Sequence, residues 1–502
     1  MAEVPQTNHP NLDSMSTVIT SIWGSMNFRR FTHACAGVRA ASLWLCVAMC
    51  SICCATSVVA HDEKSDGPPT GIPNPSIATS LPKQGDPFGS RAALAGIGIT
   101  FAINYGGEVF GVTSGGIKRG SRYTGQLETA VDIDFDRIAG WKGLTFHTNA
   151  FQLHGRGVSN SHLGIFDPVT NYEATPSTRL FEVWFEQAIL DKELSVRFGQ
   201  MRVDYDGEFV NSTTAGLFIS ASFGWPSFLG SNLPSGGVTY PIIAPGIRLK
   251  VQTGKLTVLL AVYNDDPAGP CDGDPQFCNN DGLKFRLRDN PFVIGEVQYK
   301  YGDSKIAGEL NGQIKIGGFI DFGKFEDKRF GTDGLSLADP LSNGIARRYH
   351  QNQGVYAVID QQIYRPAGSK GDDGIFAFGR VAGLPGDRNT IEFAFDAGLR
   401  FSGFIPRRSN DEFGVAFGFN KVASSLSGLD RDTSRFTGAS GPVRDSEAVA
   451  ELTYKAQIMP GLIIQPDIQY IWHPGGKAAD PNNPSKPVSD AIVLGVRSVV
   501  NY

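Results

Sequence analysis

The chain has 502 residues, with 60 glycines, 33 phenylalanines and only 19% charged residues, below the quarter that is usual in soluble domains. Its formal net charge of −5 and its pI near 5.9 provide no basic surface, which argues against nucleic-acid binding. The mean hydropathy of −0.13 does not exclude a transmembrane β-barrel, because lipid-facing and lumen-facing residues alternate along its strands and cancel in an average.

An export signal is expected near the N-terminus. Residues 40–60 form an uncharged apolar run that follows Arg29, Arg30 and Arg39 and ends in small residues at Ala60. This is the layout of a secretory signal peptide, and we expect cleavage after Ala60. An uncleaved anchor helix is the alternative, since the run is long enough to span a bilayer.

Three regions are therefore predicted. Residues 1–60 are an N-terminal extension and signal peptide, in which Met1 and Met26 are alternative starts. Residues 61–90, rich in Pro, Ser and Gly, are expected to be a flexible periplasmic lead-in. Residues 91–502 contain no further candidate for a transmembrane helix, so a mature chain that meets a membrane does so with strands.

Alternation of apolar and polar residues with a period of two recurs almost to the last residue. In IEFAFDAGLRF (391–401), the apolar residues fall on one face and Glu392, Asp396 and Arg400 on the other, as in a β-strand with two different faces. The predicted strands span about 9–13 residues, which matches a tilted membrane crossing better than a soluble strand of about 5–6. Aromatic residues often end the apolar faces, as an interfacial girdle requires: Tyr105, Tyr123, Tyr299, Tyr301, Trp472 and Tyr502.

Strands that cross hydrocarbon must pair all their backbone groups, so they persist only in a closed cylinder. We predict an all-β fold, a transmembrane antiparallel up-and-down β-barrel of about 16 strands, which leaves an aqueous lumen. The strands are expected near 97–110, 121–136, 142–154, 179–190, 193–204, 245–253, 256–264, 291–301, 305–320, 353–364, 374–383, 390–404, 412–422, 446–457, 461–472 and 489–501.

One long insertion is expected to fold into the barrel. Residues 205–244, which hold Trp225, are Gly-rich and too apolar for a solvated external loop, so we expect them to constrict the pore. A trimer contact or an outward latch is the alternative. Short turns such as Met459-Pro460-Gly461 are expected on the periplasmic side. The other long insertions are expected outside the cell or folded inward: 155–178, 265–290, 323–350 and 423–445.

Two cysteines follow the signal region, Cys271 and Cys278, in the polar segment CDGDPQFC. In an exported protein such a pair most simply forms one disulfide that closes a loop. A metal pair is the alternative, but two ligands without a nearby His or further Cys make a poor site.

Candidate pore-lining residues lie on the polar strand faces. In a wet lumen, aromatic side chains can stack on the apolar face of a solute, and Arg and carboxylates can bind its hydroxyls through charge-assisted hydrogen bonds. For each residue taken alone, the alternative is that it simply lines the water-filled lumen and contacts no particular solute. The candidates are Glu182, Trp184, Glu186, Arg197, Arg248, Lys250, Glu296 and Arg400 on the wall, with Trp225 in the insertion.

Enzymatic patterns are weak. Glu182 and Glu186 share a strand face, but four residues at about 3.3 Å each separate their backbones by about 13 Å, too far to assume a glycosidase pair with carboxyls about 5–9.5 Å apart. Asp132, Asp134 and Asp136 resemble the start of a calcium loop, yet Arg137 stands where glycine is needed. No zincin, phosphate-loop or nucleophile-elbow motif is present, and no cofactor is indicated.

Several stretches resemble the carbohydrate-selective porin family of the OprB type. They are RAALAGIGITFAINYGGEVFGVTSGGIKRG (91–120), GWKGLTFHTNAFQLHGRG (140–157), FGWPSFLGSNLPSGGVTYP (223–241), YNDDPAGP (263–270) and QPDIQYIWHPGG (465–476). Their joint order is specific and covers essentially the whole mature chain. One departure is the terminal Tyr502, where phenylalanine usually ends the assembly signal.

The resemblance implies a porin in the bacterial outer membrane for passive, selective diffusion of small sugars. The implied partners are monosaccharides or small oligosaccharides, outer-membrane lipid, and the barrel assembly machinery through the C-terminal strand; a monomer and a homotrimer both remain open. A general or ion-selective porin is one alternative function. A plugged structural or adhesive barrel, or a barrel hydrolase, is another.

Overall fold

The computed structural model describes residues 70–502, apart from 206, 304–305, 307–308 and 370–372. The expected signal peptide, its cleavage site after Ala60 and the first part of the lead-in lie outside the described residues. Among the helices of the described residues, none is long and apolar enough to cross a membrane.

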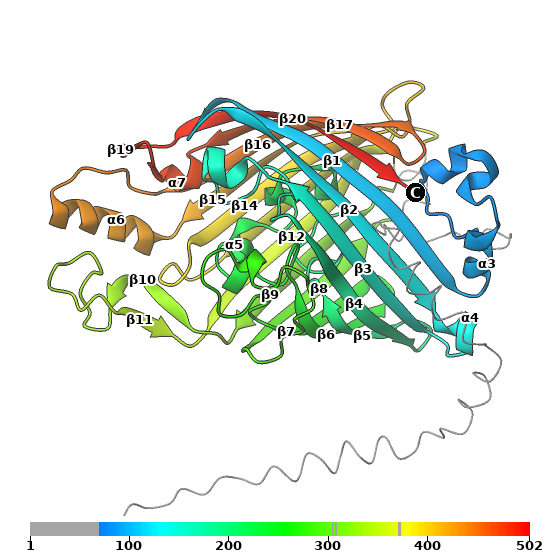
Figure 1. Ribbon diagram of the computed structural model, residues 1–502, viewed down its shortest axis with the longest axis horizontal. Helices are drawn as coiled ribbons and strands as arrows, with labels where there is room; N and C mark the ends of the chain where they lie inside the picture. The colour runs from blue at the N-terminus through cyan, green and yellow to red at the C-terminus, as the bar shows by residue number, and fades with distance from the viewer. Residues whose placement is uncertain (1–69, 206, 304–305, 307–308, 370–372) are drawn as a thin grey trace, which may run out of the picture. The chain divides into compact units, whose positions relative to one another are not determined.

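Sixteen antiparallel strands form one closed barrel, in which β20 returns to pair with β1, which confirms the predicted fold (Figure 1). The barrel strands are β1 (Ile99–Gly116), β2 (Gly120–Asp134), β3 (Leu144–Gly155), β4 (Ser177–Ile189), β5 (Leu194–Met201), β6 (Ala244–Thr253), β7 (Leu256–Asn264), β8 (Pro291–Tyr301), β9 (Gly312–Asp321), β12 (Asn352–Tyr364), β13 (Gly374–Gly383), β14 (Ile391–Ser402), β15 (Glu412–Val422), β16 (Ser446–Met459), β17 (Leu462–Trp472) and β20 (Ser489–Asn501).

Small elements lie between these strands. Two hairpins stand apart from the barrel sheet, β10 (Phe325–Gly331) with β11 (Ala346–Tyr349), and β18 (Ala479–Asp480) with β19 (Asn483–Pro487). The helices are η2 (Ile77–Ser80), η3 (Pro82–Gly85), α3 (Ser90–Gly96), α4 (Phe135–Ala139), η4 (Ser159–Leu163), η5 (Ala215–Leu217), η6 (Ala221–Phe223), α5 (Ser227–Gly230), η7 (Pro234–Gly236), η8 (Pro275–Phe277), α6 (Ser424–Thr437) and α7 (Pro474–Lys477).

The two largest differences from the predicted strand boundaries arise because pairing partners decide where a strand begins and ends. β1 continues past residue 110 to Gly116, since β20 offers a partner as far as Ser489. β9 begins at Gly312 and not near residue 305, because Gly312 is the partner of Tyr301, the last residue of β8.

In an up-and-down barrel, every second connection along the chain lies at the same end. The six long ones, after β3, β5, β7, β9, β15 and β17, therefore share one end, which we call the long-loop end. The opposite short-turn end carries tight turns such as the one at Gly461 between β16 and β17, together with the start of β1 and the end of β20.

The two faces of the strands differ as predicted. On β6, Ile247 is 58% exposed on the outside, whereas the neighbouring Arg248 is 1% exposed on the inside. Exposed apolar side chains in this alternation form the surface that a barrel presents to lipid. Ile391 was expected to face outward with Phe393 and is instead fully buried, because a register shift between these two residues turns it inward.

The described part of the lead-in packs against the end of β20. The Arg91 guanidinium in α3 lies 4.4 Å from the ring centroid of Phe101 and 4.6 Å from that of Tyr502. It also donates to the Tyr502 carbonyl at 3.2 Å, and the Tyr502 hydroxyl donates to the Gly85 carbonyl at 2.6 Å. The turn at Gly461 lies so close that a Cβ there would meet the Ile77 nitrogen at 2.1 Å. The final residue is thus enclosed by the lead-in where the barrel closes.

We predict that Arg91→Ala weakens this closure. The substitution removes two cation–π contacts and two charged hydrogen bonds, to the carbonyls of Phe101 and Tyr502. We expect the free energy of unfolding to fall by about 2 kcal/mol. The measurement is a guanidinium unfolding curve of the protein in detergent. Arg119→Ala, at an exposed position between β1 and β2, is the control, and equal midpoints for the two variants would contradict the prediction.

Candidate functional site

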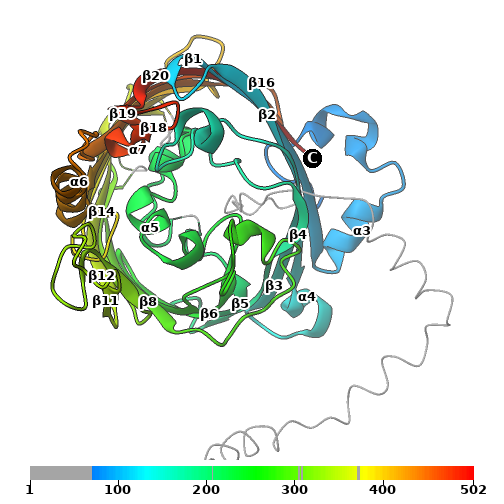
Figure 2. The ribbon, with the colours of Figure 1, turned by 60° about the vertical axis from the view of Figure 1, so that its left-hand side comes forward.

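The connection between β5 and β6, residues 202–243, crosses the interior of the barrel; we call it the inward segment. Lys315 of β9 donates to the carbonyls of Gly207 at 3.1 Å and Asn211 at 2.7 Å. On the wall beyond β9, Glu451 of β16 accepts the backbone N–H of Ile219 at 2.7 Å. These strands are far from β5 and β6 in the barrel order, and Figure 2 shows α5 inside the ring of strands.

Arg380 of β13 is a further anchor of the inward segment. It donates to the carbonyls of Val210 at 3.1 Å, Ser222 at 2.5 Å and Gly224 at 3.0 Å, and it pairs with Asp396 at 2.9 Å. Buried backbone groups outside a sheet need partners, and wall charges supply them here.

A second inward segment, residues 156–176 between β3 and β4, is held in the same way. Glu447 of β16 accepts the backbone N–H of Phe166 at 3.0 Å, and Gln469 of β17 donates to the Val169 carbonyl at 2.8 Å. The two segments also bond to each other, because the N–H of Asn171 donates to the carbonyl of Ile219 at 3.1 Å.

The anchors Lys315, Arg380, Glu447 and Glu451 were not among the predicted site residues. In the sequence they are marked only by their position on the polar face of a strand, and many other residues share this property. Which polar wall residue meets a loop is decided only when the loop folds.

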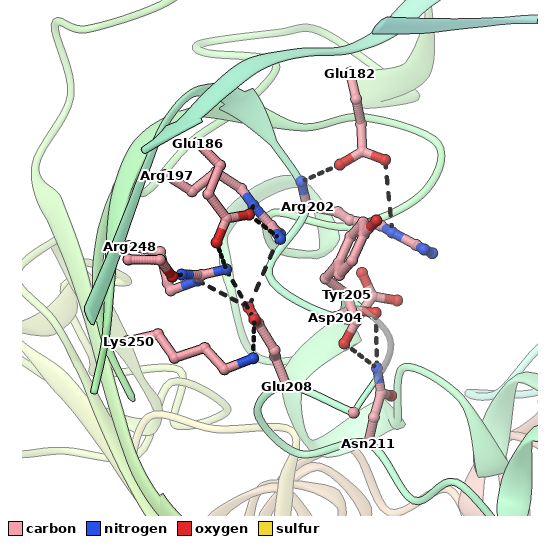
Figure 3. Close-up of polar contacts among 12 residues, drawn as sticks. Glu182, Glu186, Arg197, Arg202, Asp204, Tyr205, Glu208, Asn211, Arg248 and Lys250 are labelled. Carbon is pink, nitrogen blue, oxygen red and sulfur yellow. Dashed lines mark hydrogen bonds and ion pairs between the residues drawn. The ribbon is translucent and has the colours of Figure 1, made fainter. Parts of the chain in front are cut away.

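An ion-pair network on β4, β5 and β6 joins several predicted residues (Figure 3). Arg197 pairs with Glu186 at 2.8 Å, and Arg248 bridges Glu186 at 3.1 Å and Glu208 at 2.9 Å. Lys250 lies 3.6 Å from Glu208. The network therefore contains three cations and two carboxylates, so its charges are almost balanced.

Aromatic rings hold Arg197 in this network. Its guanidinium lies 4.3 Å from the Trp184 ring and 4.2 Å from the Tyr205 ring. Trp184 is thus a partner of Arg197. Tyr205 and Glu208 come from the inward segment, and the sequence reasoning named neither of them.

A cavity of about 680 Å³ lies between the two inward segments and the wall formed by β2, β3 and β4. Of the predicted site residues, Glu182 and Trp225 line it. Its aromatic lining consists of Phe151, Phe166, Tyr172, Phe181, Tyr205, Trp225 and Tyr240, and its charged lining of Glu128, Asp167, Glu173, Glu182, Arg202, Asp204 and Asp274.

Two predicted residues lie apart from both the network and the cavity. Glu296 of β8 is buried and accepts a hydrogen bond from Gln298 at 2.7 Å. Arg400 of β14 pairs with Glu412 at 3.5 Å and stacks on Phe376 at 4.6 Å.

The loop after β7 closes over the cavity. Cys271 and Cys278 are joined by a disulfide, and Asp274 and Gln276 between them line the cavity. Gln276 accepts the backbone N–H of Thr175 at 2.7 Å, which ties this loop to the second inward segment. Among the described residues, no group of three or more His, Cys, Asp or Glu side chains could hold a metal ion.

Comparisons with known proteins agree with this architecture. The family model described as "Carbohydrate-selective porin, OprB family" matches residues 118–502. Porin B of Pseudomonas aeruginosa is 24% identical over 82% of this chain and 89% of its own length. The putative porin QuiX of Acinetobacter baylyi is 23% identical over 83% of this chain and 92% of its own length. The high-pH structure of Pseudomonas putida OprB shares the fold, with a TM-score of 0.72, 23% identity and coverage of 83% of this chain and 97% of its own.

We predict that Arg380→Ala loosens the inward segment. Three backbone carbonyls lose their donor, and Asp396 is left without its cation. Removing one partner of a buried ion pair lowers the free energy of unfolding by about 3–5 kcal/mol. We expect noisier and larger single-channel currents in planar bilayers. Arg348→Ala, which removes an exposed pair with Glu326 on the β10–β11 hairpin, is the matched control; currents that are alike in the two variants would refute the anchoring role.

Proposed function

The chain belongs to the OprB family of carbohydrate-selective porins, and from this we propose how its interior handles a sugar. As a member of that family, it is an outer-membrane porin through which small sugars diffuse passively. Its similar proteins are porins, and we propose that this chain likewise catalyses no reaction.

We propose that the cavity between the two inward segments is the sugar-contact site. The observation that supports this proposal is the lining of the cavity. It combines aromatic rings, such as Trp225 and Tyr240, with the charged side chains of Glu182 and Arg202. A pyranose has apolar faces that stack on rings and hydroxyls that bond to charged groups. A volume of about 680 Å³ lies within the usual range for small-ligand pockets.

We propose that the long-loop end faces the outside of the cell. We also propose that the loop closed by the Cys271–Cys278 disulfide borders the outer entrance of the pore. The inward segments narrow the lumen, and the network of Glu186, Arg197, Glu208, Arg248 and Lys250 provides a wall of hydrogen-bond donors and acceptors beside the path. Because its cations and carboxylates are nearly balanced and bonded to one another, this part of the wall does not retain an ion.

Assembly is proposed to start from β20, which is followed directly by the aromatic Tyr502. The exposed apolar residues of the outer strand faces, such as Ile247 and Ile316, are proposed to contact outer-membrane lipid.

A plugged structural barrel is the second candidate, and the filling of the lumen favours it. Phe209, Phe228 and Leu229 of the inward segment are almost fully buried and pack in one cluster with Phe292 and Phe319 of the wall. Planar-bilayer conductance separates the two functions: a plugged barrel carries no steady current, whereas a sugar channel carries a current that added sugar reduces.

We predict that Trp225→Ala weakens the block of this current by glucose. Loss of one ring that stacks on the sugar corresponds to about 1 kcal/mol, or roughly a fivefold higher half-blocking concentration. Trp141→Ala, an exposed tryptophan between β2 and β3 at the short-turn end, is the control. An unchanged half-blocking concentration in Trp225→Ala would contradict the proposed contact, and the absence of any current in the unmodified protein would contradict the channel.

A further inference from the structure

The charges that line the cavity are strongly unequal. Its lining includes one cation, Arg202, within the part of the chain that the structure describes. Six acidic residues line the same space: Glu128, Asp167, Glu173, Glu182, Asp204 and Asp274.

The lone cation of the cavity already has an acidic partner. Arg202 lies 3.7 Å from Glu182, and its backbone N–H also donates to that carboxylate at 3.4 Å. Other cations near the cavity are not part of its lining. Arg197, Arg248 and Lys250 pair with carboxylates of the network, and Arg497 pairs with Glu108. Arg179 is engaged by the carbonyls of Pro241 and Gln276, to which it donates at 2.6 and 3.4 Å. An anionic solute would therefore find no uncommitted positive charge among the described lining residues.

One acid of the wall retains unused acceptor capacity. Glu128 of β2 is 3% exposed, and its Oε1 accepts a hydrogen bond from Asn149 at 2.7 Å. Its Oε2 is buried without a hydrogen-bond partner among the described residues. A buried carboxylate oxygen without a donor is costly, and a solute that brings an N–H or O–H donor reduces that cost.

The acidic side chains on the two inward segments also have too little positive charge nearby to offset the cost of burying them. Burial raises the pKa of Glu173 to about 7, although Ser159 bonds to it and opposes the shift. Burial likewise raises the pKa of Asp204 despite the nearby Arg202, and that of Asp167 despite a hydrogen bond from Ser222. A nearby cation favours the ionised form of such groups, and a further anion disfavours it.

We propose that this cavity selects among sugars by charge, so that neutral and amino sugars pass and sugar acids are rejected. An ammonium group on a sugar supplies the cation that the six acids lack and donates N–H bonds to them. A sugar carboxylate adds a like charge in a partly desolvated space. This inference rests on the proposed function, since it concerns the same cavity.

The test compares three sugars of similar size in proteoliposomes that contain the full mature chain. Vesicles are loaded with radiolabelled glucose, glucosamine or glucuronate in salt buffer, so that small ions compensate the charge, and efflux is measured. We expect glucosamine to leave at least as fast as glucose, and glucuronate about tenfold more slowly, as a discrimination near 1.4 kcal/mol gives. Glucuronate efflux as fast as glucose efflux overturns the inference.

The source of the discrimination is tested with the double variant Glu128→Gln/Asp204→Asn. It replaces two acidic side chains of the cavity by amides of similar volume, and we expect the ratio of glucuronate to glucose efflux to rise severalfold. Glu326→Gln, on the exposed β10–β11 hairpin, is the control and should keep the ratio of the unmodified protein. A ratio in the double variant that equals that of the control overturns the assignment to these acids.

Different results would contradict the proposed sugar pathway and the proposed selection by charge. If glucose itself does not leave vesicles that contain the unmodified protein, the proposed sugar pathway is wrong. If glucose leaves and glucuronate follows at the same rate, the pathway stands and the selection by charge is wrong. If the double variant does not insert, the comparison of the three sugars in the unmodified protein still decides.

Discussion

A backbone N–H or C=O that leaves water must find a partner within the protein, and this requirement organises the whole barrel. The strands meet it by pairing around a closed ring in which β20 returns to β1. The segments that enter the lumen have no strand beside them, so charged and amide side chains of the wall take over. Lys315 and Arg380 donate to their carbonyls, and Glu447 and Glu451 accept their N–H groups.

The wall charges therefore have two different uses. Some hold the inward segments in place, as Arg380 does with three carbonyls. Others pair among themselves, as in the network around Arg197 and Glu208, where cations and carboxylates nearly cancel. In our proposal, the charges that remain for a solute are those of the acidic cavity lining near Glu128. Selectivity in such a channel then depends less on the number of lumen charges than on which of them are already engaged.

The ends of the chain meet the same requirement at the short-turn end. Tyr502 closes the pairing of β20 with β1, and Arg91 of α3 and Gly85 of the lead-in cover its ring and hydroxyl. This contact joins residues that are distant in sequence, so it could not be expected from the composition of the lead-in, which only indicated a polar segment rich in Pro and Gly.

About sixteen strands and their two faces could be predicted from the sequence alone, because a period of two is a local property of each strand. It also placed Glu186, Arg197, Arg248 and Lys250 on the polar faces of their strands. Glu186 meets both arginines, whereas Lys250 joins them only through Glu208 of the inward segment. Only the tertiary structure decided which wall residues hold the inward segments and that Ile391 turns inward at a register shift. These outcomes depend on partners far along the chain, and the position of a polar residue on a strand contains no information about which loop will need its hydrogen bond.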